Sequence, residues 1–140
     1  MNQTFWARMH GRATHFPIAL LIVSVVFDQS AFWWRDELPR REFRAVGFYS
    51  LLIAAPASPF AVLSGIALSK GKLTGSGSLL LHHLFIWPAC GLLVGLAVWR
   101  LVVREDASTR ASKCYLVLVT IASAAMMAAG YWGGEMILRG

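Results

Sequence analysis

The chain has 140 residues, of which 57% are hydrophobic and 14% are charged, and its mean hydropathy is +0.59. Soluble domains are about a quarter charged, so this composition excludes an ordinary soluble protein and a disordered chain. The net charge of +6 would suit nucleic acid in a soluble protein, but basic loops of a membrane protein report topology and lipid contact, so we expect no nucleic-acid partner.

Four apolar stretches lie between blocks of charge, and each is long enough to cross a bilayer, which takes about 20 residues as a helix. We place the spans at about 16–34, 45–69, 77–100 and 114–136. Only helices satisfy their backbone hydrogen bonds over such runs, because barrel strands alternate in polarity. The sequence therefore predicts one all-α domain over residues 1–140, an integral membrane four-helix bundle, and no internal repeat is evident.

The first stretch contains a single charge, Asp28, in its second half. Aromatic and basic residues follow at 32–35, where a cleavage site needs small ones, so the stretch is a span and not a cleaved signal peptide. A carboxylate within a span is costly unless it is paired. We expect Asp28 to pair with Arg44 or Arg100 near the same membrane surface, with a proton relay as its alternative role.

Residues that shape helix packing follow in the later stretches. Pro56 and Pro59 each remove a backbone donor from the second stretch, so we expect a kink there. Gly91 and Gly95 form a GxxxG pair in the third stretch, and the fourth is rich in small residues that permit close helix approach. We expect these small residues to pack within the bundle, and contact with another subunit is the alternative.

Four spans place both termini and the loop at 70–78 on one membrane side, here called side A, and the other two loops on side B. The basic residues of side A are Arg8, Arg12, Lys70, Lys72 and Arg139, and those of side B are Arg35, Arg40, Arg41, Arg44, Arg100, Arg104, Arg110 and Lys113. Cytoplasmic loops carry the excess of Lys and Arg, so side B is expected to be cytoplasmic and both termini extracytoplasmic.

All four histidines of the chain map to side A. His15 lies at the mouth of the first span, and His82 and His83 lie in the first turns of the third span, which runs in the same direction. Neighbouring positions on a helix point about 100° apart, so one of His82 and His83 faces the interior. In a helix bundle, the iron of a b-type haem can be bound by two imidazoles, one from each of two facing helices. We therefore expect His15 and either His82 or His83 to bind the haem iron.

Other residues at the same end complete the candidate cofactor site. His10 belongs to it, and Arg8 and Arg12 are placed to meet haem propionates. No CxxCH sequence exists for covalent haem attachment. Histidines with Met9 or Met136 would also suit copper, and histidines at helix ends are also found as plain interfacial residues.

The stretch from His10 to Leu21, HGRATHFPIALL, resembles the opening signature HPxxxHFPIAL of a bacterial membrane family called domain of unknown function 2231. Gly11 stands where the relatives usually have proline. The resemblance continues at Asp28, Ser64-Gly65, His82 or His83, and Gly133-Gly134-Glu135-Met136. It implies a four-helix module of the bacterial inner membrane that does redox work on the outer face, since some relatives are fused to c-type cytochrome or dehydrogenase domains.

Together these features predict a membrane-embedded electron-transfer subunit that binds haem b near the extracytoplasmic face. Its expected partners are other membrane subunits, the lipid bilayer, and an extracytoplasmic c-type cytochrome or dehydrogenase, or quinone. One alternative is a redox-inert anchor or assembly subunit of a respiratory or dehydrogenase complex, and another is a copper-handling membrane protein. Because the sequence lacks phosphate-loop, HExxH, CxxC and GxSxG motifs, we expect a subunit more than an enzyme in its own right.

Overall fold

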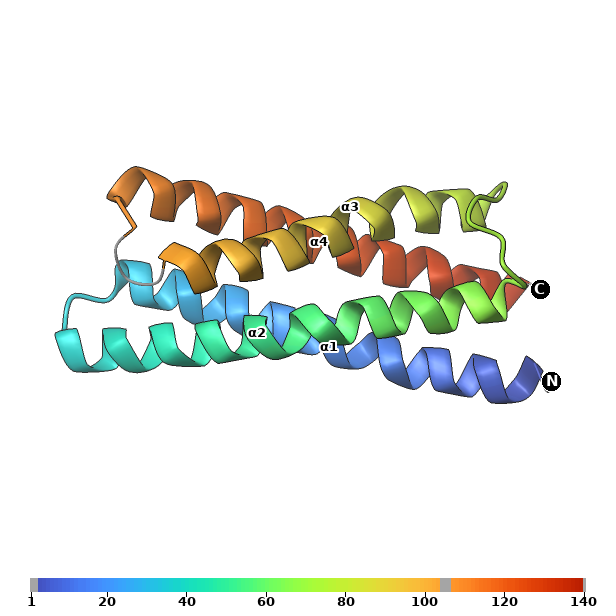
Figure 1. The fold of residues 1–140 in the computed structure, drawn as a ribbon, viewed down its shortest axis with the longest axis horizontal. Helices are drawn as coiled ribbons and strands as arrows, with labels where there is room; N and C mark the ends of the chain where they lie inside the picture. Colours follow the sequence, from blue (N-terminus) through green and yellow to red (C-terminus); the bar gives the residue numbers. More distant parts are fainter. Residues whose placement is uncertain (1–2, 104–106, 140) are drawn as a thin grey trace.

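The computed structural model describes residues 3–103 and 107–139 as four antiparallel helices (Figure 1). They are α1 (Gln3–Trp33), α2 (Glu37–Leu68), α3 (Ser78–Val103) and α4 (Thr109–Arg139). α1 begins and α4 ends at side A, the end that also carries residues 69–77 (Figure 1). All four helices are long and apolar enough to cross a membrane, so the predicted all-α membrane bundle is confirmed.

The helices extend beyond the predicted spans into the charged flanks. α1 has 31 residues and is therefore about 46 Å long, whereas the hydrocarbon core of a bilayer is about 30 Å thick. At the start of α2, Glu37 pairs with Arg40 and Arg41, and the Nε atom of Arg41 lies 2.8 Å from Glu37 Oε1. Such pairs stabilise a helix end, so the chain stays helical where it leaves the apolar region.

α2 is one continuous helix that contains Pro56 and Pro59, and the kink predicted there stays a prediction. Proline has no N–H, so Pro59 leaves the carbonyl of Ala55 without its usual helical donor. The hydroxyl of Ser58 donates to that oxygen over 3.0 Å. A carbonyl that lipid cannot satisfy is thereby hydrogen-bonded within the helix itself.

Each helix packs against two neighbours and lies diagonally across the bundle from the third, so α1 is opposite α3 and α2 is opposite α4. The closest pairs are the hairpins α1–α2 and α3–α4. Large apolar side chains fill the centre, where Leu21, Leu51, Leu93 and Val119 are fully buried. Helices in lipid associate through this kind of close van der Waals packing, because lipid is as apolar as the side chains.

The GxxxG pair of α3 faces outward, so the prediction that it packs inside the bundle was wrong. A Cβ atom added at Gly91 or Gly95 would meet nothing within 4 Å. The close approaches are made instead by Gly47 and Gly65 of α2 and Gly133 of α4, each beside a polar side chain of the neighbouring helix.

The two hairpins repeat one arrangement, which corrects the expectation that the chain has no internal repeat. Positions of α1 recur in α3 after 72 residues, so that Leu21 and Leu93 are both fully buried. Positions of α2 recur in α4 after 68 residues, so that Ala54 and Ala122 are also both fully buried. Since α1 and α3 run in the same direction on opposite corners, an approximate two-fold axis along the bundle relates the hairpins.

Candidate functional site

His10 of α1 turns toward α2 at the side-A end of the first hairpin. Its Nδ1 atom lies 3.2 Å from the carbonyl oxygen of Ala61 and 2.9 Å from Oγ of Ser64. A carbonyl oxygen only accepts, so Nδ1 carries the proton and donates. The Ser64 hydroxyl donates to the same Ala61 oxygen over 2.6 Å, which leaves its own oxygen free to accept from His10. In the neutral ring, Nε2 then holds a free lone pair.

His82 of α3 repeats this contact in the second hairpin. Its Nδ1 atom donates to the carbonyl oxygen of Ala129 on α4 over 2.7 Å. His82 follows His10 by 72 positions and Ala129 follows Ala61 by 68, the same offsets that relate the buried residues of the two hairpins. Both imidazoles are therefore fixed in the same tautomer by equivalent helix carbonyls.

Glycines make room for both rings. A Cβ atom at Gly65 would lie 2.9 Å from Cε1 of His10, and one at Gly133 would lie 3.3 Å from Nδ1 of His82. These two glycines are also 68 positions apart. A repeated spacing in the sequence could have revealed these neighbours. On each helix, the polar or glycine position at side A is 18 positions from its counterpart at side B: His10 and Asp28, Gly47 and Gly65, His82 and Arg100, and Tyr115 and Gly133.

His10, His82 and His83 lie at the side-A end of the bundle, with His82 and His83 next to each other on α3, whereas His15 is exposed on the outer side of α1. His10 projects from α1 and His82 from α3, which lie diagonally across the bundle from each other. The ring centroids of His82 and His83 lie 5.7 Å apart, and Nδ1 of His83 is buried with no hydrogen-bond partner in the described part of the chain. These three residues are called the histidine cluster below.

His15 is exposed on the outer side of α1, and its predicted pairing with His82 or His83 stays a prediction. It follows His10 by five positions, which turn through about 140° on a helix, so the two rings cannot face the same way. Arg8 and Arg12 are exposed near the start of the same helix, at the side-A end of the bundle. Among residues 3–103 and 107–139, no three His, Cys, Asp or Glu side chains gather as a potential metal site.

The glycines beside the histidines lead to a testable prediction. Gly65→Ala should destabilise the protein by about 1–3 kcal/mol, because its methyl group displaces the ring of His10. Gly91→Ala is the matched control, since it adds the same methyl group to open space and should stabilise its helix by up to about 1 kcal/mol. Unfolding temperatures in detergent compare the two variants, and equal shifts would contradict the close contact at Gly65.

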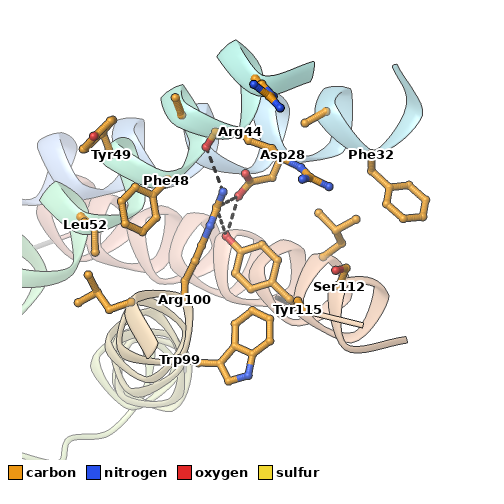
Figure 2. Close-up of a pocket in the computed structure, with 16 residues that line it drawn as sticks. Asp28, Phe32, Arg44, Phe48, Tyr49, Leu52, Trp99, Arg100, Ser112 and Tyr115 are labelled. Atoms are coloured by element: carbon orange, nitrogen blue, oxygen red, sulfur yellow. Dashed lines mark hydrogen bonds and ion pairs between the residues drawn. The ribbon is translucent and has the colours of Figure 1, made fainter. Parts of the chain in front are cut away.

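A second polar cluster lies at side B and contains Asp28, Arg100 and Tyr115 (Figure 2). Asp28 is only 5% exposed, and its Oδ2 atom forms an ion pair with Nη1 of Arg100. The Tyr115 hydroxyl donates to the same carboxylate over 2.6 Å and accepts from Arg100 over 2.8 Å. Of the two predicted partners of Asp28, Arg100 is confirmed, and Arg44 contributes its carbonyl oxygen to Arg100 over 3.1 Å.

The residues around this ion pair accommodate both of its side chains. A Cβ atom at Gly47 would lie 2.2 Å from Oδ1 of Asp28, so only glycine fits beside the carboxylate. The guanidinium carbon of Arg100 lies 5.5 Å from the ring centre of Phe48 and 5.2 Å from that of Tyr115, which adds cation–π attraction. Asp28 and Arg100 occupy equivalent positions in the two hairpins, and they meet between them.

The two polar clusters lie at opposite ends of the bundle. The 18 positions between His10 and Asp28 correspond to about 27 Å along a helix, which is close to the thickness of the hydrocarbon core. Asp28 is therefore remote from the histidine cluster. The sequence predicted the depth of Asp28 and of His82, whereas Ser64, Tyr115 and the three glycines were not singled out as neighbours.

Four apolar helices that enclose a polar cluster near each end define an integral membrane bundle. The chain belongs to the family described as predicted membrane protein (DUF2231), whose match covers residues 8–140. Neither a curated protein nor a solved structure matches the chain.

Proposed function

We propose that the protein is a membrane electron-transfer subunit that binds haem b between His10 and His82. The observation that carries this proposal is the hydrogen bond from each Nδ1 atom to a helix carbonyl, Ala61 for His10 and Ala129 for His82. Histidines that bind metals usually donate their second ring nitrogen to such an acceptor, which fixes the ring and leaves Nε2 as the ligand.

The residues fit the chemistry of this group. A b-type haem needs only two axial ligands, and one imidazole from each of two diagonal helices would supply them. A larger group of metal ligands, which the described residues do not contain, is not required. Bound haem supplies one-electron redox chemistry. Arg8 and Arg12, exposed at the side-A end, provide cationic partners for the propionates. His83, beside His82, is a second imidazole at the same site.

The site's place near side A favours exchange with a redox partner on that side of the membrane. We propose an extracytoplasmic c-type cytochrome or dehydrogenase as the donor, and quinone or a larger respiratory complex in the membrane as the acceptor. The chain would work there as one subunit among others in the bacterial inner membrane.

The proposed orientation places both termini outside the cytoplasm. It rests on the eight basic residues of side B against five on side A, of which Arg104 and the side chain of Arg139 lie outside the described residues. A reporter that is active only in the cytoplasm should be dark when it is fused after position 140 and bright when it is inserted between Arg104 and Arg110. The opposite pattern would place the histidine cluster on the cytoplasmic side.

The absorption spectrum of the purified protein tests the function. Protein expressed with full haem supply should show a Soret band and, after reduction with dithionite, the α and β bands of a b-type haem. Metal analysis of the same sample distinguishes the other candidates. Copper without haem would favour a copper-handling protein, and absence of both would favour a redox-inert anchor or assembly subunit.

A further inference from the structure

A cavity of about 680 Å³ opens at side B, remote from the histidine cluster. Its walls come from all four helices, and Asp28, Arg100 and Tyr115 form its polar floor (Figure 2). A volume of this size is typical of sites for small organic ligands. Nothing in the proposed redox function uses this cavity.

The charges around the cavity leave one cation available to a ligand. Arg100 is compensated by Asp28 within the floor, and Arg41 pairs with Glu37 at the start of α2. Arg44 also lines the cavity and is exposed, and its guanidinium forms no ion pair within the described part of the chain. The cavity therefore offers a free guanidinium to an anion, with Arg41 next to it one helical turn away.

The remaining walls of the cavity are apolar and reach the outer surface of the bundle. The apolar lining includes Phe48, Tyr49 and Leu52 of α2 and Trp99 and Leu101 of α3. Tyr49 is 62% exposed and Leu101 is 47% exposed, so these walls continue into the surface that lipid covers. A soluble anion would gain nothing from such walls, and a neutral apolar molecule would gain nothing from Arg44.

We propose that the side-B cavity is a binding site for an anionic phospholipid. Its phosphate would meet the free guanidinium group of Arg44, with Arg41 one helical turn away as a further positive charge, and an acyl chain would lie along Leu52 and Leu101 between α2 and α3. Basic pockets between transmembrane helices are suited to acidic headgroups, and each arginine near a headgroup contributes to binding. The bound lipid would join the two hairpins at the end where the ion pair of Asp28 and Arg100 already connects them. This site is independent of haem binding.

Native mass spectrometry of the full chain in detergent tests the proposal. Phosphatidylglycerol should remain bound at concentrations at which phosphatidylcholine is lost. Arg44→Gln should weaken phosphatidylglycerol binding about fivefold, which corresponds to one arginine near a headgroup, and Arg41→Gln with Arg44→Gln should weaken it further. Arg110→Gln is the matched control, because Arg110 is exposed at side B and does not line the cavity.

Three results would overturn the proposal. Equal retention of phosphatidylglycerol and phosphatidylcholine would show that the negative charge of the headgroup does not contribute to binding. Equal losses with Arg44→Gln and Arg110→Gln would show attraction to the whole basic surface. Displacement of the lipid by millimolar inorganic phosphate or glycerol phosphate would show a site for small anions. Unchanged unfolding temperatures of the glutamine variants in lipid-free detergent establish that they fold.

Discussion

Arg100→Ala should destabilise the bundle by about 3–5 kcal/mol, the largest effect we expect from one substitution on stability. The variant leaves Asp28 in a nearly inaccessible position without its cation, and a buried uncompensated charge costs this much. It also removes the guanidinium that joins α3 to the carbonyl oxygen of Arg44 on α2. Thermal and denaturant unfolding in detergent measure the loss.

Exchange of the two charges provides the control. Because Asp28 and Arg100 occupy equivalent positions of the two hairpins, Asp28→Arg combined with Arg100→Asp preserves an ion pair at the same place. The double variant should lose less stability than the sum of the two single losses, by the coupling energy of residues in contact, about 0.5–3 kcal/mol. Simple addition of the two single losses would show that the positions are not interchangeable.

Asp28→Asn separates a structural charge from a proton relay. It keeps the shape and the hydrogen-bonding capacity of the side chain but leaves Arg100 without its counterion. The structural role predicts lower stability and an unchanged haem spectrum, because Asp28 lies about 27 Å along the helix from His10. Normal stability with loss of a proton-coupled activity would instead favour a relay.

The fold could be predicted because the bilayer leaves few options. Long apolar runs between charged blocks can only be helices in lipid, and four of them with short connections form an antiparallel bundle. Depth was also predictable, since position along a helix converts directly into distance. For that reason Asp28 could be assigned to Arg44 or Arg100 before the structure was known, and Arg100 proved to be the ion-pair partner.

The side of a helix on which a residue lies was harder to predict than its depth in the membrane. The apolar stretch begins at residue 16, which made His15 the apparent mouth of the first span, but α1 starts at Gln3 and packs against α2 as far as His10. Five positions separate the two histidines, and that turn of about 140° decides which one enters the bundle. Apolar residues on every side of a membrane helix hide this direction, because lipid and core favour the same side chains.

The repeat was hidden for a different reason. At side B, equivalent positions of the two hairpins carry different side chains. Asp28 of the first hairpin corresponds to Arg100 of the second, and Gly47 corresponds to Tyr115. An acid and a base at equivalent positions attract each other, whereas two identical charges would repel. The hairpins therefore complement each other at side B and are alike at side A, where His10 and His82 make the same contact.

The histidines carry the second large effect. If haem b binds as proposed, His10→Ala and His82→Ala should each remove the b-type spectrum and lower haem content at least tenfold, because each would delete a proposed haem ligand together with the hydrogen bond that orients it. Combining the two substitutions should add little, since one loss already breaks the ligand pair. The haem content of purified protein and the spectrum after reduction measure the effect.

His15→Ala is the matched control, because it removes an exposed histidine from the same helix. It should retain the spectrum, and so should His83→Ala if His82 is the ligand of α3. Loss of haem from the His15 variant with full retention in the His10 variant would return the assignment to His15. Ser64→Ala is a milder test of His10, since it removes one acceptor of Nδ1 and leaves the Ala61 carbonyl. In the proposed site, that variant should retain haem with a shifted reduction potential, because the hydrogen bonds of a ligating histidine tune the iron that it binds.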